Sequence, residues 1–214
     1  MRTMVGAMVA LMSFTLAVTF WIAATHFDGA RQTRLNDVNA IRAAYLRADL
    51  LPEPYRAEIQ DLLRQYVDVR IEGVRTGNVE QAISQSEELQ KRMWSKAMDG
   101  RKKTSDPIFD GYLTQSMIDV VNLHAKRVAV YKEYSIPYMV WGALYGITAL
   151  AMASIGCYTG LSGANRPPVV PAFVLIFSVV MFLIADLDSP INGAFKVSHR
   201  ALFDLQNMMN VPNG

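Results

Sequence analysis

The stretch MVGAMVALMSFTLAVTFWIAAT, from Met4 to Thr25, decides the fold class of this chain because it contains no charged residue. A helix rises ~1.5 Å per residue, so about 20 apolar residues cross the ~30 Å hydrocarbon core of a bilayer. A secretory signal peptide is the alternative, but its apolar region is typically about 7–15 residues long. We therefore predict a transmembrane helix over residues 4–25.

Two further apolar runs, residues 136–161 and 169–185, predict a second and a third transmembrane helix. The seven residues between them are rich in Gly, Asn and Pro, which is typical of a tight turn. No alternating strand pattern of useful length is present. The sequence therefore predicts an all-α membrane protein with three transmembrane helices and a cytosolic helical bundle.

The charged residues are concentrated between the first two spans. Of the 21 Lys and Arg residues, 17 lie between His26 and Ser135, with 16 of the 19 Asp and Glu residues. Basic residues flank this loop at both ends, whereas the turn between the second and third spans carries only Arg166. The positive-inside rule therefore places the large loop in the cytoplasm. Both signs alternate and the net charge is only +2, which argues against nucleic acid as a partner.

The polar stretch, residues 26–135, is predicted to be helical throughout. Apolar residues recur at helical spacing, as in the stripe Tyr55, Ile59, Leu62, Tyr66 and Val69. Pro52, Pro54 and Gly77-Asn78 separate the helices. A last amphipathic helix is expected over residues 190–210, either cytosolic or at the membrane interface. These stripes must be buried against one another or against another subunit, as in a bundle.

Small residues recur along one face of the second span. Gly142, Gly146, Ala153 and Gly156 would allow close helix packing in lipid, and we slightly favour a partner in the same subunit. The first span carries the bulky residues Phe14, Phe20 and Trp21, which are candidates for an apolar pore constriction. Contact with lipid or with the protein core is the alternative for these rings.

Few residues indicate chemistry. Asp186 and Asp188, at the end of the third span, are candidates for cation or proton handling, although helix capping explains them equally well. His26, His124 and His199 lie far apart in the sequence, and Cys157 stands alone. No metal site, cofactor or enzyme active site is therefore predicted.

Two stretches carry a family resemblance: NDVNAIRAAYLRADLLPEPYRAEIQDLLRQYVDVR, Asn36 to Arg70, and IADLDSPINGAFKVS, Ile184 to Ser198. Together they resemble the bacterial bestrophin-like domain family. The positions that match its motifs include Asn39, Tyr45, Arg47, Pro52, Pro54, Asp188, Pro190 and Gly193. Members usually carry one more hydrophobic segment before the first span, so the resemblance implies a four-span plan.

The resemblance implies a multi-pass protein of the bacterial inner membrane. It also implies a homo-oligomer, pentameric by analogy with bestrophins, that conducts small ions, anions first. Two alternatives stay open. One is a non-conducting scaffold or sensor whose cytosolic bundle binds a protein, and the other is a proton-coupled transporter that uses Asp186 or Asp188.

Overall fold

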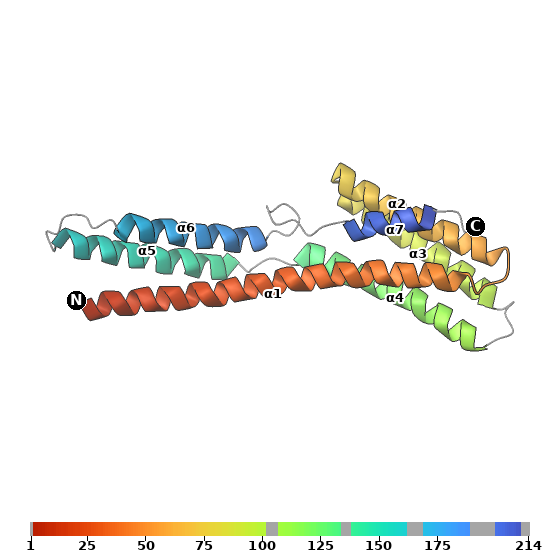
Figure 1. Cartoon of the computed structure of the whole chain (residues 1–214), viewed down its shortest axis with the longest axis horizontal. Helices are drawn as coiled ribbons and strands as arrows, with labels where there is room; N and C mark the ends of the chain where they lie inside the picture. Colours follow the sequence, from red (N-terminus) through yellow and green to blue (C-terminus); the bar gives the residue numbers. More distant parts are fainter. Residues whose placement is uncertain (1, 102–106, 134–137, 162–168, 189–199, 211–214) are drawn as a thin grey trace. The chain divides into compact units, whose positions relative to one another are not determined.

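The computed structural model describes residues 2–101, 107–133, 138–161, 169–188 and 200–210 (Figure 1). The regular elements of these residues are all helices, which confirms the all-α prediction for the described part of the chain. They are α1 (Arg2–Ala48), α2 (Tyr55–Thr76), α3 (Val79–Arg101), α4 (Pro107–Glu133), α5 (Tyr138–Leu161), α6 (Val169–Leu187) and α7 (Arg200–Asn210).

The chain divides into two compact units, each built from two parts of the sequence. The apolar unit comprises Met1–Ala30 and Glu133–Val197, and the polar unit comprises Arg31–Lys132 and Ser198–Gly214. Helix α1 contributes residues to both units.

The apolar unit has a small core of side chains from α1, α5 and α6. Its buried members are Met12, Leu16, Ala23, Leu144, Ala151, Phe177 and Ile184. Of the described helices, α1 is long and apolar enough to cross a membrane, and only 17% of its apolar window is buried. The described apolar stretches of α5 and α6, Tyr138–Ser154 and Val174–Leu187, are shorter. The three-span arrangement therefore stays a prediction.

Several large side chains of the apolar unit point away from its core. Phe14 is 67% exposed, Phe20 40% and Trp21 68%, so none of the three belongs to the core of this chain. A Cβ atom built on Gly142, Gly146 or Gly156 meets nothing within 4 Å, and Ala153 is exposed.

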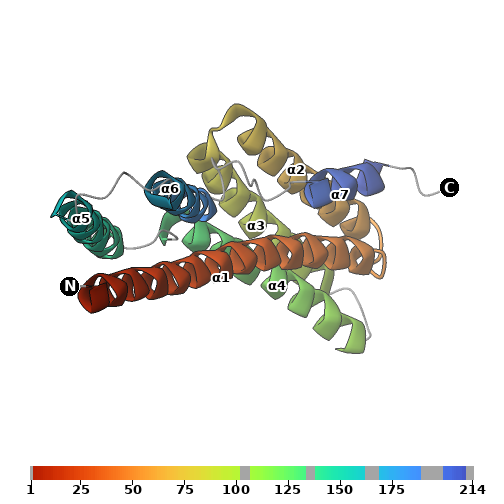
Figure 2. The ribbon, with the colours of Figure 1, turned by 60° about the vertical axis from the view of Figure 1, so that its left-hand side comes forward.

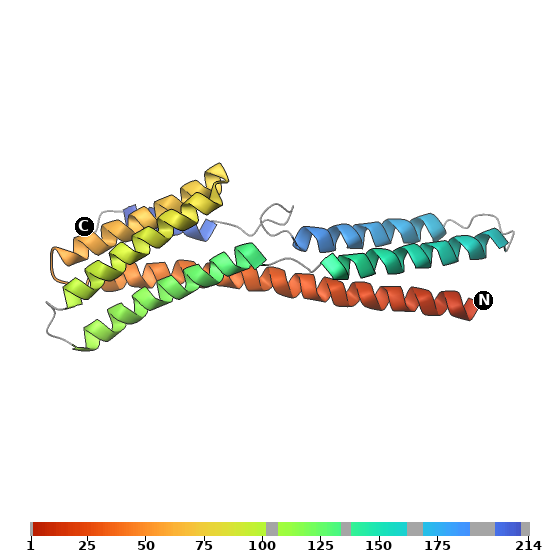
Figure 3. The same cartoon turned by 180° about the vertical axis from the view of Figure 1, so that it is seen from behind.

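In the polar unit, the breaks before and after α2 fall at the predicted Pro and Gly residues. Helix α1 ends at Ala48, α2 begins after Pro54, and Gly77 closes α2 with a φ of 74°, a left-handed conformation that glycine adopts without strain. Helices α2 and α3 then run side by side (Figure 3). They approach so closely that a Cβ atom on Gly73 would lie 2.4 Å from that of Ala82.

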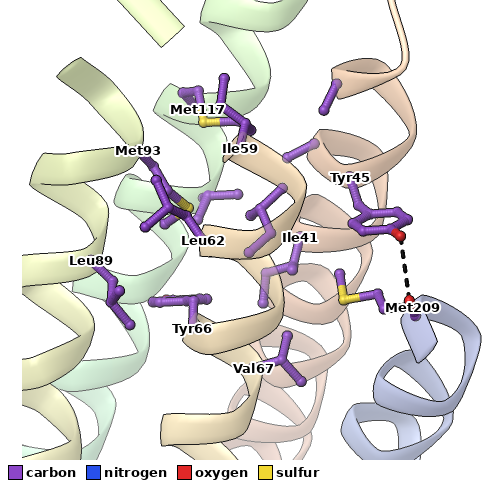
Figure 4. Close-up of a cluster of buried hydrophobic side chains, with 14 of the residues drawn as sticks. Ile41, Tyr45, Ile59, Leu62, Tyr66, Val67, Leu89, Met93, Met117 and Met209 are labelled. Carbon is purple, nitrogen blue, oxygen red and sulfur yellow. Dashed lines mark hydrogen bonds between the residues drawn. The ribbon is translucent and has the colours of Figure 1, made fainter. Parts of the chain in front are cut away.

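The core of the polar unit takes apolar side chains from α1, α2, α3, α4 and α7 (Figure 4). Ile59, Leu62 and Tyr66 of the predicted α2 stripe are buried in it. Helix α7 lies along α2 (Figure 2) and buries Leu202, Leu205 and Met209. The apolar face that we considered for the membrane interface is therefore covered within this unit.

Candidate functional site

A cluster of charged side chains lies inside the polar unit. Asp37 of α1 has a side chain with 0% exposure, and its Oδ2 atom accepts a hydrogen bond from Nη2 of Arg70 on α2. The Arg127 Nε atom of α4 lies 3.5 Å from the same carboxylate oxygen. Three helices therefore meet at one buried carboxylate.

Helical register explains why these charges are buried. Asp37 lies four residues before Ile41 and seven before Ala44, both of which are fully buried on α1. Arg70 follows the buried Tyr66 by four residues and Val67 by three on α2. The charges thus occupy core positions of their helices.

A chain of neutral polar groups adjoins the charges. Gln90 on α3 donates through Nε2 to the Tyr66 hydroxyl at 3.2 Å, and that hydroxyl lies 2.9 Å from Nδ1 of His124. Arg127 Nη2 lies 3.2 Å from the same Nδ1 atom. A guanidinium only donates hydrogen bonds, so Nδ1 must be the acceptor. The neutral His124 ring therefore carries its proton on Nε2, and Tyr66 donates to Nδ1.

The electrostatics of the cluster keep this histidine neutral. Burial, together with the positive charges of Arg127 and Arg70, lowers the pKa of His124 to about 4. Burial and repulsion from Arg70 also lower the pKa of Arg127, to about 10, so this guanidinium stays charged at neutral pH. Two buried cations consequently face one carboxylate.

A second polar contact holds the C-terminal helix in place. The Tyr45 hydroxyl accepts a hydrogen bond from Arg64 Nη2 at 2.6 Å and donates to the backbone oxygen of Met209 at 3.3 Å (Figure 4). Arg64 Nε donates to the same backbone oxygen at 3.0 Å. The motif residue Tyr45 thus ties α1 and α2 to the end of α7.

The other motif positions are scattered. Arg47 donates hydrogen bonds to the Ser116 hydroxyl and to the Tyr112 backbone oxygen, which ties α1 to α4. Asn39, Pro52 and Pro54 are exposed.

The predicted acidic exit of the third span is described only in part. Asp186 is buried, and Asp188 accepts a hydrogen bond from Trp141 Nε1 at 3.4 Å. Pro190 and Gly193 lie outside the described residues. Over the described ranges, no group of three or more His, Cys, Asp or Glu side chains could hold a metal ion.

Sequence reasoning missed the roles of Asp37, Arg70 and Arg127. The sequence analysis gives these charges no role, and the three residues lie 33 or more positions apart. The available signal was their helical register, because a charged residue that falls in line with the apolar stripe of its own helix is expected to be buried.

These features define a class of protein: an all-helical protein in its described part, with an apolar unit that contains a candidate membrane span and a polar bundle packed around buried charges. The chain belongs to the bestrophin-like family, because the Bestrophin-like domain matches residues 1–202. This match confirms the resemblance of the two sequence motifs. No curated protein and no solved structure matches the chain.

Proposed function

We propose that this protein is an ion channel for small anions that works as a homo-oligomer in the bacterial inner membrane. The observation that carries the proposal is membership of the bestrophin-like family over residues 1–202. The name of the family points to channels rather than to enzymes. In the proposed topology, the N-terminal part of α1 crosses the bilayer together with α5 and α6, and the polar unit is cytoplasmic.

The exposed face of α1 supports an oligomer around a pore. Leu11, Phe14, Val18 and Trp21 are exposed large hydrophobic residues that share one helix face by their spacing. In a membrane these side chains contact lipid, a neighbouring subunit or a pore. A ring of such residues around a central axis would form the apolar constriction predicted from the sequence.

The small-residue face of α5 supports the same arrangement. Gly142 and Gly146 are exposed, and a Cβ atom added to either meets nothing within 4 Å among the described residues. In lipid, helices associate through close packing of such faces. We assign this face to the contact between neighbouring subunits.

Anion flux from liposomes tests the channel. The full chain is purified, reconstituted into liposomes loaded with chloride, and compared with protein-free liposomes. We expect chloride efflux above background, and a smaller flux of potassium. Background flux for both ions would refute the proposal.

Substitution of two exposed phenylalanines tests whether α1 lines the pore. Phe14 on α1 is 67% exposed, and Phe182 on α6 is 65% exposed. We expect Phe14→Ala to widen the constriction and raise chloride flux, whereas the matched control Phe182→Ala leaves it unchanged. Equal effects of the two substitutions would contradict a constriction at α1.

A groove in the polar unit favours the second candidate function, a non-conducting scaffold or sensor. It has a volume of about 560 Å³ and lies between α3 and α4. The lining residues are Glu87, Gln90, Lys91, Trp94, Ile118, Val121 and Asn122. A photo-crosslinker at Trp94 that captures one stoichiometric cytosolic protein would support this function, and capture of none would count against it.

A further inference from the structure

The buried cluster of the polar unit carries more positive than negative charge. Asp37 is opposed by Arg70, whose side chain is 6% exposed, and by Arg127, whose side chain is 22% exposed. His124 is neutral and contributes nothing to the balance. At least one buried positive charge is therefore left without a counter-charge in the cluster.

Hydrogen bonding shows the same imbalance. Among the described residues, three donor atoms of the cluster are buried without an acceptor, namely Nε and Nη1 of Arg70 and Nε2 of His124. The Nε atom of Arg127 makes no hydrogen bond and has only its 3.5 Å contact with the Asp37 carboxylate. One acceptor atom, Oδ1 of Asp37, is without a donor. Buried polar groups in native proteins almost always have a partner, and an unmade hydrogen bond to a charged group is costly. In the described part of the chain, these buried donors therefore outnumber the acceptors that the cluster offers them.

We propose that this cluster is a binding site for a small inorganic anion of the size of chloride, held by Arg70, Arg127 and the Nε2–H group of His124. An anion provides both the negative charge and the hydrogen-bond acceptors that the cluster lacks, because it neutralises the surplus positive charge and accepts hydrogen bonds from several donors. A water molecule accepts hydrogen bonds but carries no charge, so it does not neutralise the surplus positive charge. The burial of Asp37 and Arg70 favours a monatomic ion over a bulky oxyanion, and the partly exposed Arg127 provides the route from solvent.

The site lies in the polar unit and does not depend on conduction. Bound anion would stabilise the folded polar unit, because a ligand that binds only the folded state raises its stability in proportion to the logarithm of its concentration. The site could therefore exist in a protein that conducts nothing. A failed flux experiment and a failed binding experiment are distinguishable for this reason.

Unfolding of the full chain in detergent micelles tests the site. Sodium gluconate is replaced by sodium chloride at constant ionic strength, and the midpoint of thermal unfolding is followed by circular dichroism. We expect the midpoint to rise by about 3 °C or more for the natural chain. We expect Arg127→Gln to abolish the rise and Arg92→Gln, the change of an exposed arginine on α3, to preserve it. No rise in the natural chain, or the same rise in Arg127→Gln, would overturn the proposal.

A second measurement needs no variant of the cluster. The chain has three histidines, so ¹⁵N-labelled histidine gives few signals, and His26→Gln and His199→Gln assign them. We expect chloride, but not gluconate, to shift the Nε2 resonance of His124. A His124 resonance that is the same in both salts would show that only water satisfies these donors, and the proposal would fall.

Discussion

Replacing Asp37 by Asn is the sharpest test of the buried cluster. The substitution keeps the size of the side chain and removes the carboxylate that pairs with both Arg70 and Arg127. Two unit charges 3.5 Å apart, the Asp37–Arg127 distance, attract each other by about 5 kcal/mol at the effective dielectric constant of about 20 that suits protein sites. Removing one partner of a buried ion pair typically costs about 3–5 kcal/mol. We expect Asp37→Asn to lower the free energy of unfolding by that amount.

The assay is chemical and thermal unfolding of the full chain in detergent, followed by far-ultraviolet circular dichroism. For a chain of this size, 1 kcal/mol corresponds to about 2–4 °C, so the midpoint should fall by about 10 °C. The matched control is Asp61→Asn, an exposed position on α2, which should change the midpoint by less than about 2 °C. The double variant Asp37→Leu, Arg70→Met replaces the pair by apolar groups and should be more stable than Asp37→Asn. A loss below about 1 kcal/mol in Asp37→Asn would refute the electrostatic account of the cluster.

Three further substitutions test other features. The pKa of His124 is about 4 in the folded chain against 6.5 in an ordinary environment, so the unfolded state binds the proton more tightly. Stability should therefore fall as the pH drops from about 6.5 to about 4, by about 3 kcal/mol in all, and His124→Gln should remove this dependence in unfolding curves. Tyr45→Phe removes the hydrogen bond to Met209, and should cost about 1–2 kcal/mol and speed amide hydrogen exchange in α7. Gly73→Ala should destabilise the chain by about 1–3 kcal/mol because α2 and α3 must separate, whereas Gly111→Ala on α4 has open space and should be neutral or slightly stabilising.

For each of these substitutions, one outcome would contradict the prediction. For His124→Gln, it is a pH dependence of unfolding equal to that of the natural chain. For Tyr45→Phe, the control is Tyr131→Phe on α4, an exposed tyrosine, and equal exchange of α7 in the two variants would disprove the proposed contact. For Gly73→Ala, an effect no larger than that of Gly111→Ala would mean that the helix pair tolerates the added methyl group.

Local signals in the sequence predicted the break between α1 and α2 and the end of α2. Proline at 52 and 54 and glycine at 77 act on the backbone of their own neighbours, so the end of α1 and both ends of α2 could be read without knowledge of the fold. The stripe that contains Ile59 and Leu62 was predicted for the same reason, since its period depends only on the helix.

Contacts between distant segments could not be predicted in this way. The hydrogen bond from Tyr45 to Met209 joins residues 164 positions apart, and no local pattern specifies such a partner. The apolar face of α7 was visible in the sequence, but whether a membrane or a protein core covers it depends on the tertiary fold. The charges at Asp37 and Arg70 were overlooked because each was considered without its partner.

The polar unit is discontinuous in sequence, and this has a consequence for its synthesis. Leu202, Leu205 and Met209 complete its core, yet their helix follows the apolar helices α5 and α6 in the sequence. The apolar helices α5 and α6 are translated before α7. The apolar surface of α1 and α2 that α7 covers therefore stays exposed until α7 has been made. The core of the polar unit is therefore completed only after translation of the apolar segments. A chain cut short before Arg200 would expose this apolar surface, which quality-control proteases can recognise.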